Sequence, residues 1–323
     1  MPDQMVSRLE RHQVWVYLAA ILLGFGVGLG LDDGAGALDV AVRPTLVALL
    51  FVTFAQVRFD RLRTAAADVR FLATAVAANF VVVPVVVWGL LPVVGPDPAV
   101  RLGVLLVLLA PCTDWFITFT HLARGDTGRA MTLMPVNLVL QLALLPVYLW
   151  LMHGEVFDGI ISIGSATGTF ATLILLPLVG AWGAQRLLER TAGGPGSLER
   201  VGTLAVPLVA VVVFLVAASQ VNVVTDSLGL LPRLGGVYVA FAVAALLIGV
   251  VGGRLVGLSP GPARTLVFSV GTRNSFVVLP FALAVPDAYG LAVVVVVFQS
   301  LVELLAMVAY LRVVPWLLPD REV

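Results

Sequence analysis

Two short polar stretches interrupt long apolar runs in this chain: Ala110-Pro111-Cys112-Thr113-Asp114-Trp115 and Gly271-Thr272-Arg273-Asn274-Ser275. Each surrounding run is long enough to cross a bilayer as a helix, which takes about 20 mostly apolar residues. Proline removes a backbone donor and clashes with the preceding helical turn, so Pro111 predicts a break in the first helix. The glycine and short polar residues of the second stretch predict a matching break about half a chain later.

The composition is typical of a membrane protein. Of the 323 residues, 60% are hydrophobic and 12% are charged, whereas soluble domains are about 45–50% apolar and about 25% charged. The formal net charge is +0, and no basic stripe suggests that nucleic acid is a partner. The single cysteine, Cys112, excludes an internal disulfide and a multi-cysteine metal cluster. The first apolar run lacks a small-residue cleavage site, so we read it as a retained span and not a signal peptide.

The apolar runs predict an all-α polytopic membrane protein with about ten transmembrane helices. Most of the 19 basic residues fall in alternate loops when the N-terminus is placed inside. The positive-inside rule then puts both termini in the cytoplasm, in a multi-pass protein of the plasma (inner) membrane. The expected spans are residues 14–31, 42–57, 69–91, 100–122, 130–152, 160–188, 201–221, 235–257, 264–285 and 288–318.

An internal repeat divides the chain. Asn137-Leu138-Val139-Leu140-Gln141-Leu142 aligns with Gln299-Ser300-Leu301-Val302-Glu303-Leu304 at a shift of 162 residues, and Thr113 aligns with Thr272 at a slightly smaller shift. Five spans per repeat is an odd number, so the halves insert with opposite topology, as in many secondary carriers. We therefore expect two inverted five-helix repeats, residues 1–158 and 159–323, whose discontinuous helices 4 and 9 cross.

Matching interruptions in two inverted halves indicate the substrate site of a secondary transporter. An unpaired backbone group in hydrocarbon costs several kcal/mol, so broken helices persist only where they line a cavity or are buried in protein. The alternative is a tolerated kink between packed helices, which would need no counterpart half a chain away. The short polar residues of the two breaks, Cys112, Thr113, Asn274 and Ser275, are thus the candidate substrate ligands.

Charged residues occur beside both breaks. Asp114 and Arg273 each follow one of the aligned threonines, and charges inside a membrane usually pair because each costs at least about 2.5–3.5 kcal/mol there. We expect an Asp114–Arg273 ion pair where the broken helices cross. Its role is either to couple transport or to act as a structural lock that never touches substrate.

Glu303 lies in the middle of the tenth expected span, one turn after Gln299. The i, i+4 spacing puts both side chains on one face, and Asn137 and Gln141 share the same spacing on the fifth span. A carboxylate inside a membrane span indicates a proton-coupled or substrate-binding role. A passive hydrogen-bond network of these polar residues is the alternative.

Cys112 is the candidate ligand for a soft element. A buried cysteine is more often a small hydrophobic residue than a ligand, but this one lies on the break. A thiolate favours soft or borderline metals and metalloids. Asn79 in the third span is a single polar residue and by itself a weak signal.

The stretch Ala110-Pro111-Cys112-Thr113, followed by Leu122-Ala123-Arg124-Gly125-Asp126, resembles the span-four signature of arsenite-efflux carriers of the arsenical resistance-3 family. Leu301-Val302-Glu303 is similar to a segment in that family's last span. These carriers belong to the wider bile acid/sodium symporter superfamily, whose ninth span carries a Gly-x-Gln-Asn pattern. Here the pattern reads Gly271-Thr272-Arg273-Asn274.

The resemblance implies alternating-access export of arsenite, with antimonite as a related cargo, in exchange for protons. It implies that Cys112 binds the metalloid and that Glu303 matches the family's glutamate. It also implies a core of spans 3–5 and 8–10 that slides against a panel of spans 1, 2, 6 and 7. Asp114-Trp115 departs from the small apolar residues expected there. Arg273 replaces a glutamine that helps to coordinate sodium in the symporters, and a guanidinium has no acceptor atom, so we expect sodium-independent transport.

A carrier of a small organic anion, sodium-independent or sodium-coupled, is the alternative, with Arg273 as the partner of the anion. A membrane-embedded enzyme or receptor is a third class, which no nucleophile–base constellation or appended domain supports. The expected protein is therefore a transporter and not an enzyme, without a cofactor. Its expected partners are the solute, protons and the lipid bilayer.

Overall fold

The regular structure of the protein is helical. The computed structural model describes residues 13–30, 35–56, 68–113, 115–162, 176–188 and 201–320. Within these ranges the backbone forms helices and one isolated antiparallel bridge, between Pro111 and Arg273. This confirms the predicted all-α class. Among the described residues, four helical stretches are long and apolar enough to cross a membrane: Val69–Val94, Thr127–Gly154, Leu228–Leu255 and Leu291–Leu317.

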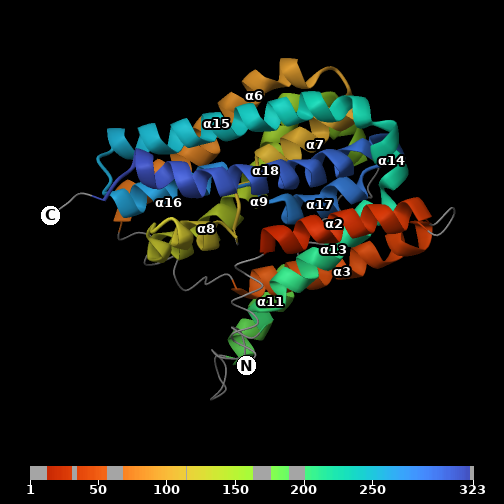
Figure 1. The fold of residues 1–323 in the computed structure, drawn as a ribbon, viewed down its shortest axis with the longest axis horizontal. Coiled ribbons are helices and arrows are strands. Elements are labelled where there is room, and N and C mark those ends of the chain that lie inside the picture. Colours follow the sequence, from red (N-terminus) through yellow and green to blue (C-terminus); the bar gives the residue numbers. More distant parts are fainter. Residues whose placement is uncertain are drawn as a thin grey trace. The chain divides into compact units, whose positions relative to one another are not determined.

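The chain divides into two compact units, each formed from two separate stretches of sequence. The first unit comprises Met1–Gln56 and Gly164–Leu228. Within it, α13 packs along α2 and α3, and α11 packs on α3 (Figure 1). The described helices of this unit are α2 (Gln13–Gly30), α3 (Ala35–Gln56), α11 (Leu176–Leu188), α13 (Ala205–Ser219) and α14 (Val221–Asp226).

The second unit comprises Val57–Ile163 and Gly229–Val323. Helix α15 packs against α16, α18 and α6, while α18 also packs against α7 and α17. The short 3-10 turn η5 (Leu228–Leu230) leads into this unit. Its other elements are α5 (Val69–Ala77), η3 (Ala78–Val82), α6 (Val83–Val94), α7 (Pro98–Leu108), α8 (Phe116–Leu122), α9 (Thr127–Ser162), α15 (Leu231–Leu255), α16 (Pro260–Gly271), α17 (Ser275–Ala284), η6 (Asp287–Tyr289) and α18 (Leu291–Leu317).

Both breaks predicted from the sequence are present. Helix α7 ends at Leu108 and α8 begins at Phe116, while α16 ends at Gly271 and α17 begins at Ser275. At a rise of 1.5 Å per residue, α7 and α16 are each roughly 17 Å long. That is about half the ~30 Å thickness of the hydrocarbon core of a bilayer. Each interrupted segment is thus a pair of half-helices separated by a break.

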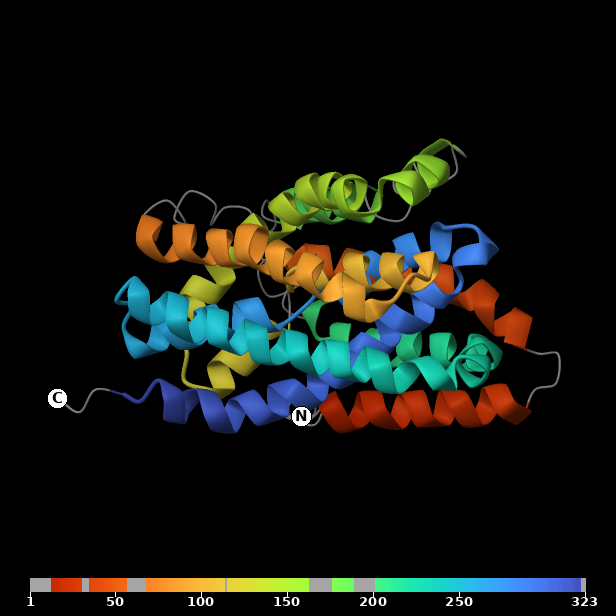
Figure 2. The same cartoon turned by 90° about the horizontal axis from the view of Figure 1, so that it is seen from above.

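A π-helical turn interrupts the regular hydrogen bonding of the third expected span. Helices α5 and α6 form one continuous rod (Figure 2), joined by the π turn η3. Such turns are rare and frequently lie at functional sites. Asn79 lies in this turn and is fully buried. The Tyr148 hydroxyl of α9 donates to the Phe80 carbonyl of the same turn at 2.6 Å.

The outer face of α15 is suited to lipid. Val239, Val243, Leu247 and Val251 follow one another at four-residue spacing, and each is 48–55% exposed. Residues four apart in a helix lie on one face, so they form a continuous apolar stripe. Exposing such a stripe to water would be unfavourable. The stripe therefore supports insertion of this helix in a membrane.

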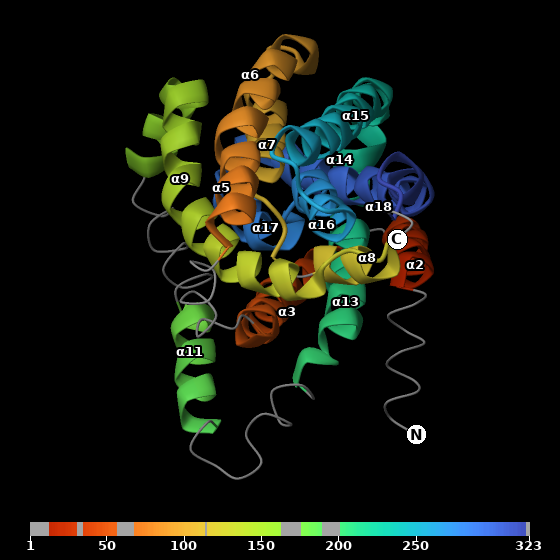
Figure 3. The same ribbon diagram turned by 90° about the vertical axis from the view of Figure 1, so that its left-hand side faces the viewer.

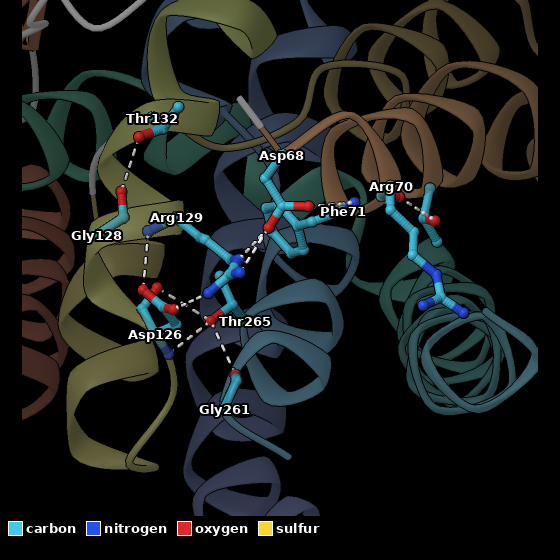
Figure 4. A network of polar contacts seen from close by, with 10 residues as sticks. Asp68, Arg70, Phe71, Asp126, Gly128, Arg129, Thr132, Gly261 and Thr265 are labelled. Atoms are coloured by element: carbon cyan, nitrogen blue, oxygen red, sulfur yellow. Dashed lines mark hydrogen bonds and ion pairs between the residues drawn. The ribbon is translucent and has the colours of Figure 1, made fainter. Parts of the chain in front are cut away.

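Polar contacts at one end of the second unit join three helices that lie side by side, α5, α9 and α16 (Figure 3). Asp126 caps the start of α9 by accepting the Arg129 N–H at 3.0 Å, and its own N–H donates to Thr265 Oγ1 of α16 at 2.8 Å (Figure 4). The Arg129 guanidinium bridges Asp126 and Asp68, donating from Nε to Asp68 Oδ2 at 2.6 Å. Asp68 itself caps α5.

The buried Arg264 joins two helix ends near this network. Its Nε and one terminal nitrogen donate to the Leu318 carbonyl, after α18, at 3.0 and 2.8 Å. The other terminal nitrogen donates to the carbonyls of Ala123 and Arg124, after α8, at 3.3 Å each. Helix C-termini carry partial negative charge, so one guanidinium holds both ends. Asp320 adds an ion pair at 3.0 Å.

We predict that Asp68 stabilises the protein through both its cap and its charge. The hydrogen bond from the Phe71 N–H and the nearby Arg129 guanidinium lower the pKa of Asp68 below its ordinary value. Asp68→Asn keeps a cap acceptor but loses the ion pair, and should cost a few tenths to about 1 kcal/mol for this half-exposed pair. Asp68→Ala should cost about 1 kcal/mol more, because the cap is also lost.

The measurement is the apparent melting temperature of the full-length protein in detergent as a function of pH. A carboxyl whose folded pKa is lowered stabilises the protein above its unfolded pKa, and this stabilisation is lost as the pH falls through the folded value. The gap between wild type and Asp68→Asn should therefore be open at pH 7 and close below the ordinary pKa of 3.8. Equal melting temperatures at pH 7 would contradict this role.

Candidate functional site: the crossing of the interrupted helices

The two breaks satisfy each other's backbone groups. The Cys112 N–H donates to the Thr272 carbonyl at 3.2 Å, and the Asn274 N–H donates to the Ala110 carbonyl at 2.8 Å. These groups have left their helices, and leaving them unpaired in an apolar interior would cost several kcal/mol each. Pro111, which has no N–H to lose, lies opposite Arg273 in the bridge. The breaks are therefore adjacent, as the sequence predicted.

Helix α9 contributes two buried amides to the crossing. Asn137 Nδ2 donates to the Cys112 carbonyl at 3.4 Å. Asn274 Nδ2 donates to Thr113 Oγ1 at 2.9 Å and to Gln141 Oε1 at 3.5 Å. Asn137 Oδ1 and Gln141 Nε2 are buried without a hydrogen-bond partner among the described residues. The α9 amides thus bind both breaks and retain one acceptor and one donor.

Helix α18 contributes the second polar pair. Glu303 Oε2 accepts the Arg273 backbone N–H at 2.9 Å and Gln299 Nε2 at 2.7 Å. Ser275 Oγ donates to Gln299 Oε1 at 2.9 Å. The chain Ser275–Gln299–Glu303–Arg273 therefore closes around the start of α17. Hydrogen bonds to an ionised carboxylate are stronger than those to a neutral carboxyl group. An ionised Glu303 would therefore bind the Arg273 N–H, and so the second break, more tightly than a protonated one.

Arg273 is fully buried, and its guanidinium binds oxygen atoms from three elements. One terminal nitrogen donates to the Leu108 carbonyl at 3.2 Å. The other donates to Asn79 Oδ1 at 2.9 Å, to the Ser269 carbonyl at 3.2 Å and to the Val270 carbonyl. The charge also lies over the ring of Phe241, 5.3 Å from its centroid, a favourable cation–π arrangement.

Cys112 lies on the first break and is 1% exposed. The Trp115 ring, after the same break, packs edge-on against Phe276 of α17 with centroids 5.7 Å apart. Within the described ranges, no three His, Cys, Asp or Glu side chains form a metal-binding group. A soft ligand at the crossing would therefore depend on this single thiol together with the surrounding amides and carboxylate.

Comparison with known proteins identifies the family. Residues 43–227 match the family model described as the Sodium Bile acid symporter family, and this segment is more than half of the chain. The chain belongs to this family. It is also 26% identical over 176 residues to the arsenical-resistance protein Acr3 of Corynebacterium glutamicum, a match that covers 51% of this chain. The chain spans about half the length of that curated relative, 47% of which is covered.

The chain thus belongs to a family described as symporters, and four of its described helices are long and apolar enough to cross a membrane. The similarity to Acr3 bears out the resemblance to arsenite carriers that the sequence motifs indicated. The crossing brings together most of the residues singled out from the sequence: Cys112, Thr113, Asn137, Gln141, Arg273, Asn274, Ser275, Gln299 and Glu303. Asp114 lies outside the described residues, so its ion pair with Arg273 stays a prediction.

Sequence reasoning underestimated Asn79 and missed Ser269 and Phe241. Asn79 accepts from Arg273 and donates to Ser269 Oγ at 3.1 Å. Its signal was an isolated amide inside an apolar span, where polar side chains are costly and usually functional. Ser269 and Phe241 gave no such signal, because serine and phenylalanine are ordinary residues of membrane helices.

We predict that Asn79→Leu destabilises the second unit. The change removes an acceptor from the buried guanidinium and a donor from Ser269, and a stranded buried polar group costs roughly 1–3 kcal/mol. The measurement is thermal unfolding of the full-length protein in detergent. Asn222→Leu, at an exposed asparagine of α14, is the matched control and should change the melting temperature little. Equal effects of the two substitutions would contradict the assignment.

Proposed function

We propose that this protein exports arsenite in exchange for protons by alternating access, with antimonite as a related cargo. The observation that carries the proposal is the position of Cys112, which is buried on the first break and shares the crossing with the Glu303 carboxylate. The similarity to an arsenical-resistance protein supports the choice of cargo. A thiolate is the side chain best matched to a soft metalloid.

Amide groups around Cys112 complement the thiol in this proposal. Arsenite at neutral pH is arsenous acid, an uncharged molecule in which trivalent arsenic bears three hydroxyl groups. Asn137 Oδ1 can accept a hydrogen bond and Gln141 Nε2 can donate one, and neither has a partner among the described residues. Thr113, Asn274 and Ser275 supply further short polar groups beside the break. The site thus offers one sulfur ligand and hydrogen-bonding groups for hydroxyls.

Glu303 is the proposed coupling group. Its Oε2 accepts N–H donors from the second break and from Gln299, and protonation would weaken both hydrogen bonds. The protonation state of Glu303 is therefore linked to the geometry of the second break. Gln299, Asn137 and Gln141 act as supporting polar residues that hold the breaks in place.

The division into two units supports movement of a core against a panel. The second unit contains the expected spans 3–5 and 8–10, and the first contains spans 1, 2, 6 and 7. We further propose the inverted repeats 1–158 and 159–323. In support, the break between α7 and α8 and the break between α16 and α17 meet through the Pro111–Arg273 bridge.

The proposed location is the inner membrane, with both termini in the cytoplasm. Arg129 lies near the start of α9, Arg254 near the end of α15 and Arg264 in α16. Contacts of these arginines and their neighbours gather the starts of α5, α9 and α16 with the end of α18. Arginine-rich loops favour the cytoplasmic side. Their meeting at one end of the second unit supports this orientation.

The organic-anion alternative is less well supported. It needs the Arg273 guanidinium as the partner of the anion, but both terminal nitrogens already donate to backbone carbonyls and to Asn79. Only Nε is left without a partner among the described residues, so an anion bound through the terminal nitrogens would require breaking several buried hydrogen bonds. The observed contacts therefore favour a cargo that binds at Cys112.

We predict that Cys112→Ser abolishes arsenite tolerance conferred on a host that lacks its own arsenite efflux. A hydroxyl is a hard, neutral group and does not replace the thiolate as a ligand for arsenic. Growth inhibition by arsenite is measured alongside the amount of protein in the membrane. The control is Thr120→Val, which replaces a buried threonine of α8 by a valine of similar size. This variant should keep tolerance. Full tolerance with Cys112→Ser would favour another cargo.

We predict that Glu303→Gln removes the dependence of arsenite transport on a pH gradient, because the amide cannot take up a proton. Arsenite accumulation is measured in everted membrane vesicles with and without an imposed gradient, acid inside. Ser300→Ala, which removes a hydroxyl that donates to the Val297 carbonyl on the same helix, should retain the gradient response. Retention of the response by Glu303→Gln would place proton coupling elsewhere.

A further inference from the structure

The Arg273 guanidinium lies between the C-terminal ends of two half-helices. Leu108 is the last residue of α7, and Ser269 and Val270 lie in the last turn of α16. Their carbonyls, which have no following helical turn to donate to them, accept from the two terminal nitrogens of Arg273. Helix C-termini carry partial negative charge, so the positive charge is placed where both ends attract it.

The same oxygen atoms form a set that suits a small monovalent cation. C-terminal ends of half-helices and unwound carbonyls are the groups that coordinate sodium in carriers with broken helices. Here the set comprises three carbonyls and Asn79 Oδ1. The Phe241 ring adds a π face that favours positive charge. The surroundings are those of a cation site.

The family name implies sodium, but the residues present here do not fit a free sodium ion at this place. The guanidinium already binds the oxygens, and it offers donors without any acceptor. Its charge is permanent and would repel a second cation. Arg273 is also 0% exposed, so the side chain cannot move into solvent without breaking these contacts.

We propose that Arg273 is a tethered, resident cation that takes the place of an exchangeable one between the two half-helices. It joins α7, α16 and the π turn η3 through its side chain, and α18 through its backbone N–H to Glu303. A cation that is covalently part of the chain neither enters nor leaves. Cation gradients therefore do no work at this position, whatever the cargo.

Removing the tethered charge should expose the site to free cations. Arg273→Gln deletes the guanidinium, leaves the carbonyls and Asn79 in place, and adds one side-chain oxygen. We expect this variant to gain a saturable stabilisation by sodium, since a ligand that binds only the folded state raises its stability. Arg273→Lys is the matched control, because it retains a tethered cation and should gain no such response.

The test is the apparent melting temperature of the purified full-length protein in choline, sodium, lithium or potassium chloride at equal ionic strength. The melting temperature of wild type should be the same in all four salts, and the melting temperature of Arg273→Lys should likewise not depend on the salt. Arg273→Gln should melt lower than wild type in choline and recover by several degrees, saturably, in at least one inorganic salt.

Three outcomes would overturn the proposal: saturable stabilisation of wild type by sodium, absence of any cation response in folded Arg273→Gln, or failure of that variant to fold in every salt. The readout contains no arsenite and no transport step. Its failure is therefore distinguishable from failure of the proposed arsenite export.

Discussion

Backbone hydrogen bonding at the crossing is the constraint on which the rest of the second unit depends. Two apolar segments of the protein leave helical geometry inside the second unit. Each break exposes backbone amide groups that hydrocarbon cannot solvate. The pairs Cys112–Thr272 and Asn274–Ala110 solve this by letting one break satisfy the other. Neither break is stable alone in these surroundings, so the two must form together. The contact between the two breaks follows directly from that pairing.

Close packing is needed for this arrangement as well. A Cβ on Gly271 would lie 2.6 Å from Cε2 of Tyr310 on α18, so a side chain there would push the break away from that helix. Tyr310 donates its hydroxyl to the Ala242 carbonyl of α15 and is held in place. Glycine at the end of α16 thus allows the second break to approach α18, where Glu303 receives the Arg273 N–H.

Two buried arginines bind the free carbonyl groups at the ends of the interrupted helices and of α18. Arg264 binds carbonyls after α8 and α18, and Arg273 binds carbonyls at the ends of α7 and α16. In both cases a planar group with several donors bridges two helix ends that would otherwise lack partners. The first lies beside the Asp68–Asp126–Arg129 network at one end of the unit, and the second lies at the crossing. The two half-helices α16 and α8 are therefore fixed at their ends as well as at their breaks.

The polar pairs of α9 and α18 align in sequence at a shift of 162 residues but carry different chemistry. Asn137 and Gln141 are both neutral amides, whereas Gln299 is followed by the acidic Glu303. Both pairs reach the crossing. The neutral pair keeps one acceptor, Asn137 Oδ1, and one donor, Gln141 Nε2, without a partner among the described residues. The acidic residue, Glu303, instead accepts the Arg273 N–H of the second break.

The sequence by itself determined the class of fold, the two breaks and most of the site. Pro111, the glycine at 271 and the polar residues inside apolar runs each carry a local cost in a membrane helix, and such costs are visible without coordinates. The i, i+4 spacing predicted that Asn137 and Gln141, like Gln299 and Glu303, share one helix face, and both pairs reach the crossing. Family resemblance rested on the same few motifs, and Cys112 was singled out because it lay on a break.

Only the tertiary structure decided which oxygens receive the buried charges. The expected partner Asp114 lies outside the described residues, and among the described ones the terminal nitrogens of Arg273 bind three backbone carbonyls and one amide oxygen from three elements: Leu108, Ser269, Val270 and Asn79. Every residue has a backbone carbonyl, so no sequence pattern marks the few that a helix end leaves free. The role of Asn79 likewise depends on a π turn that orients it. Contacts of this kind come from packing between helices distant in sequence, which local chemistry does not specify.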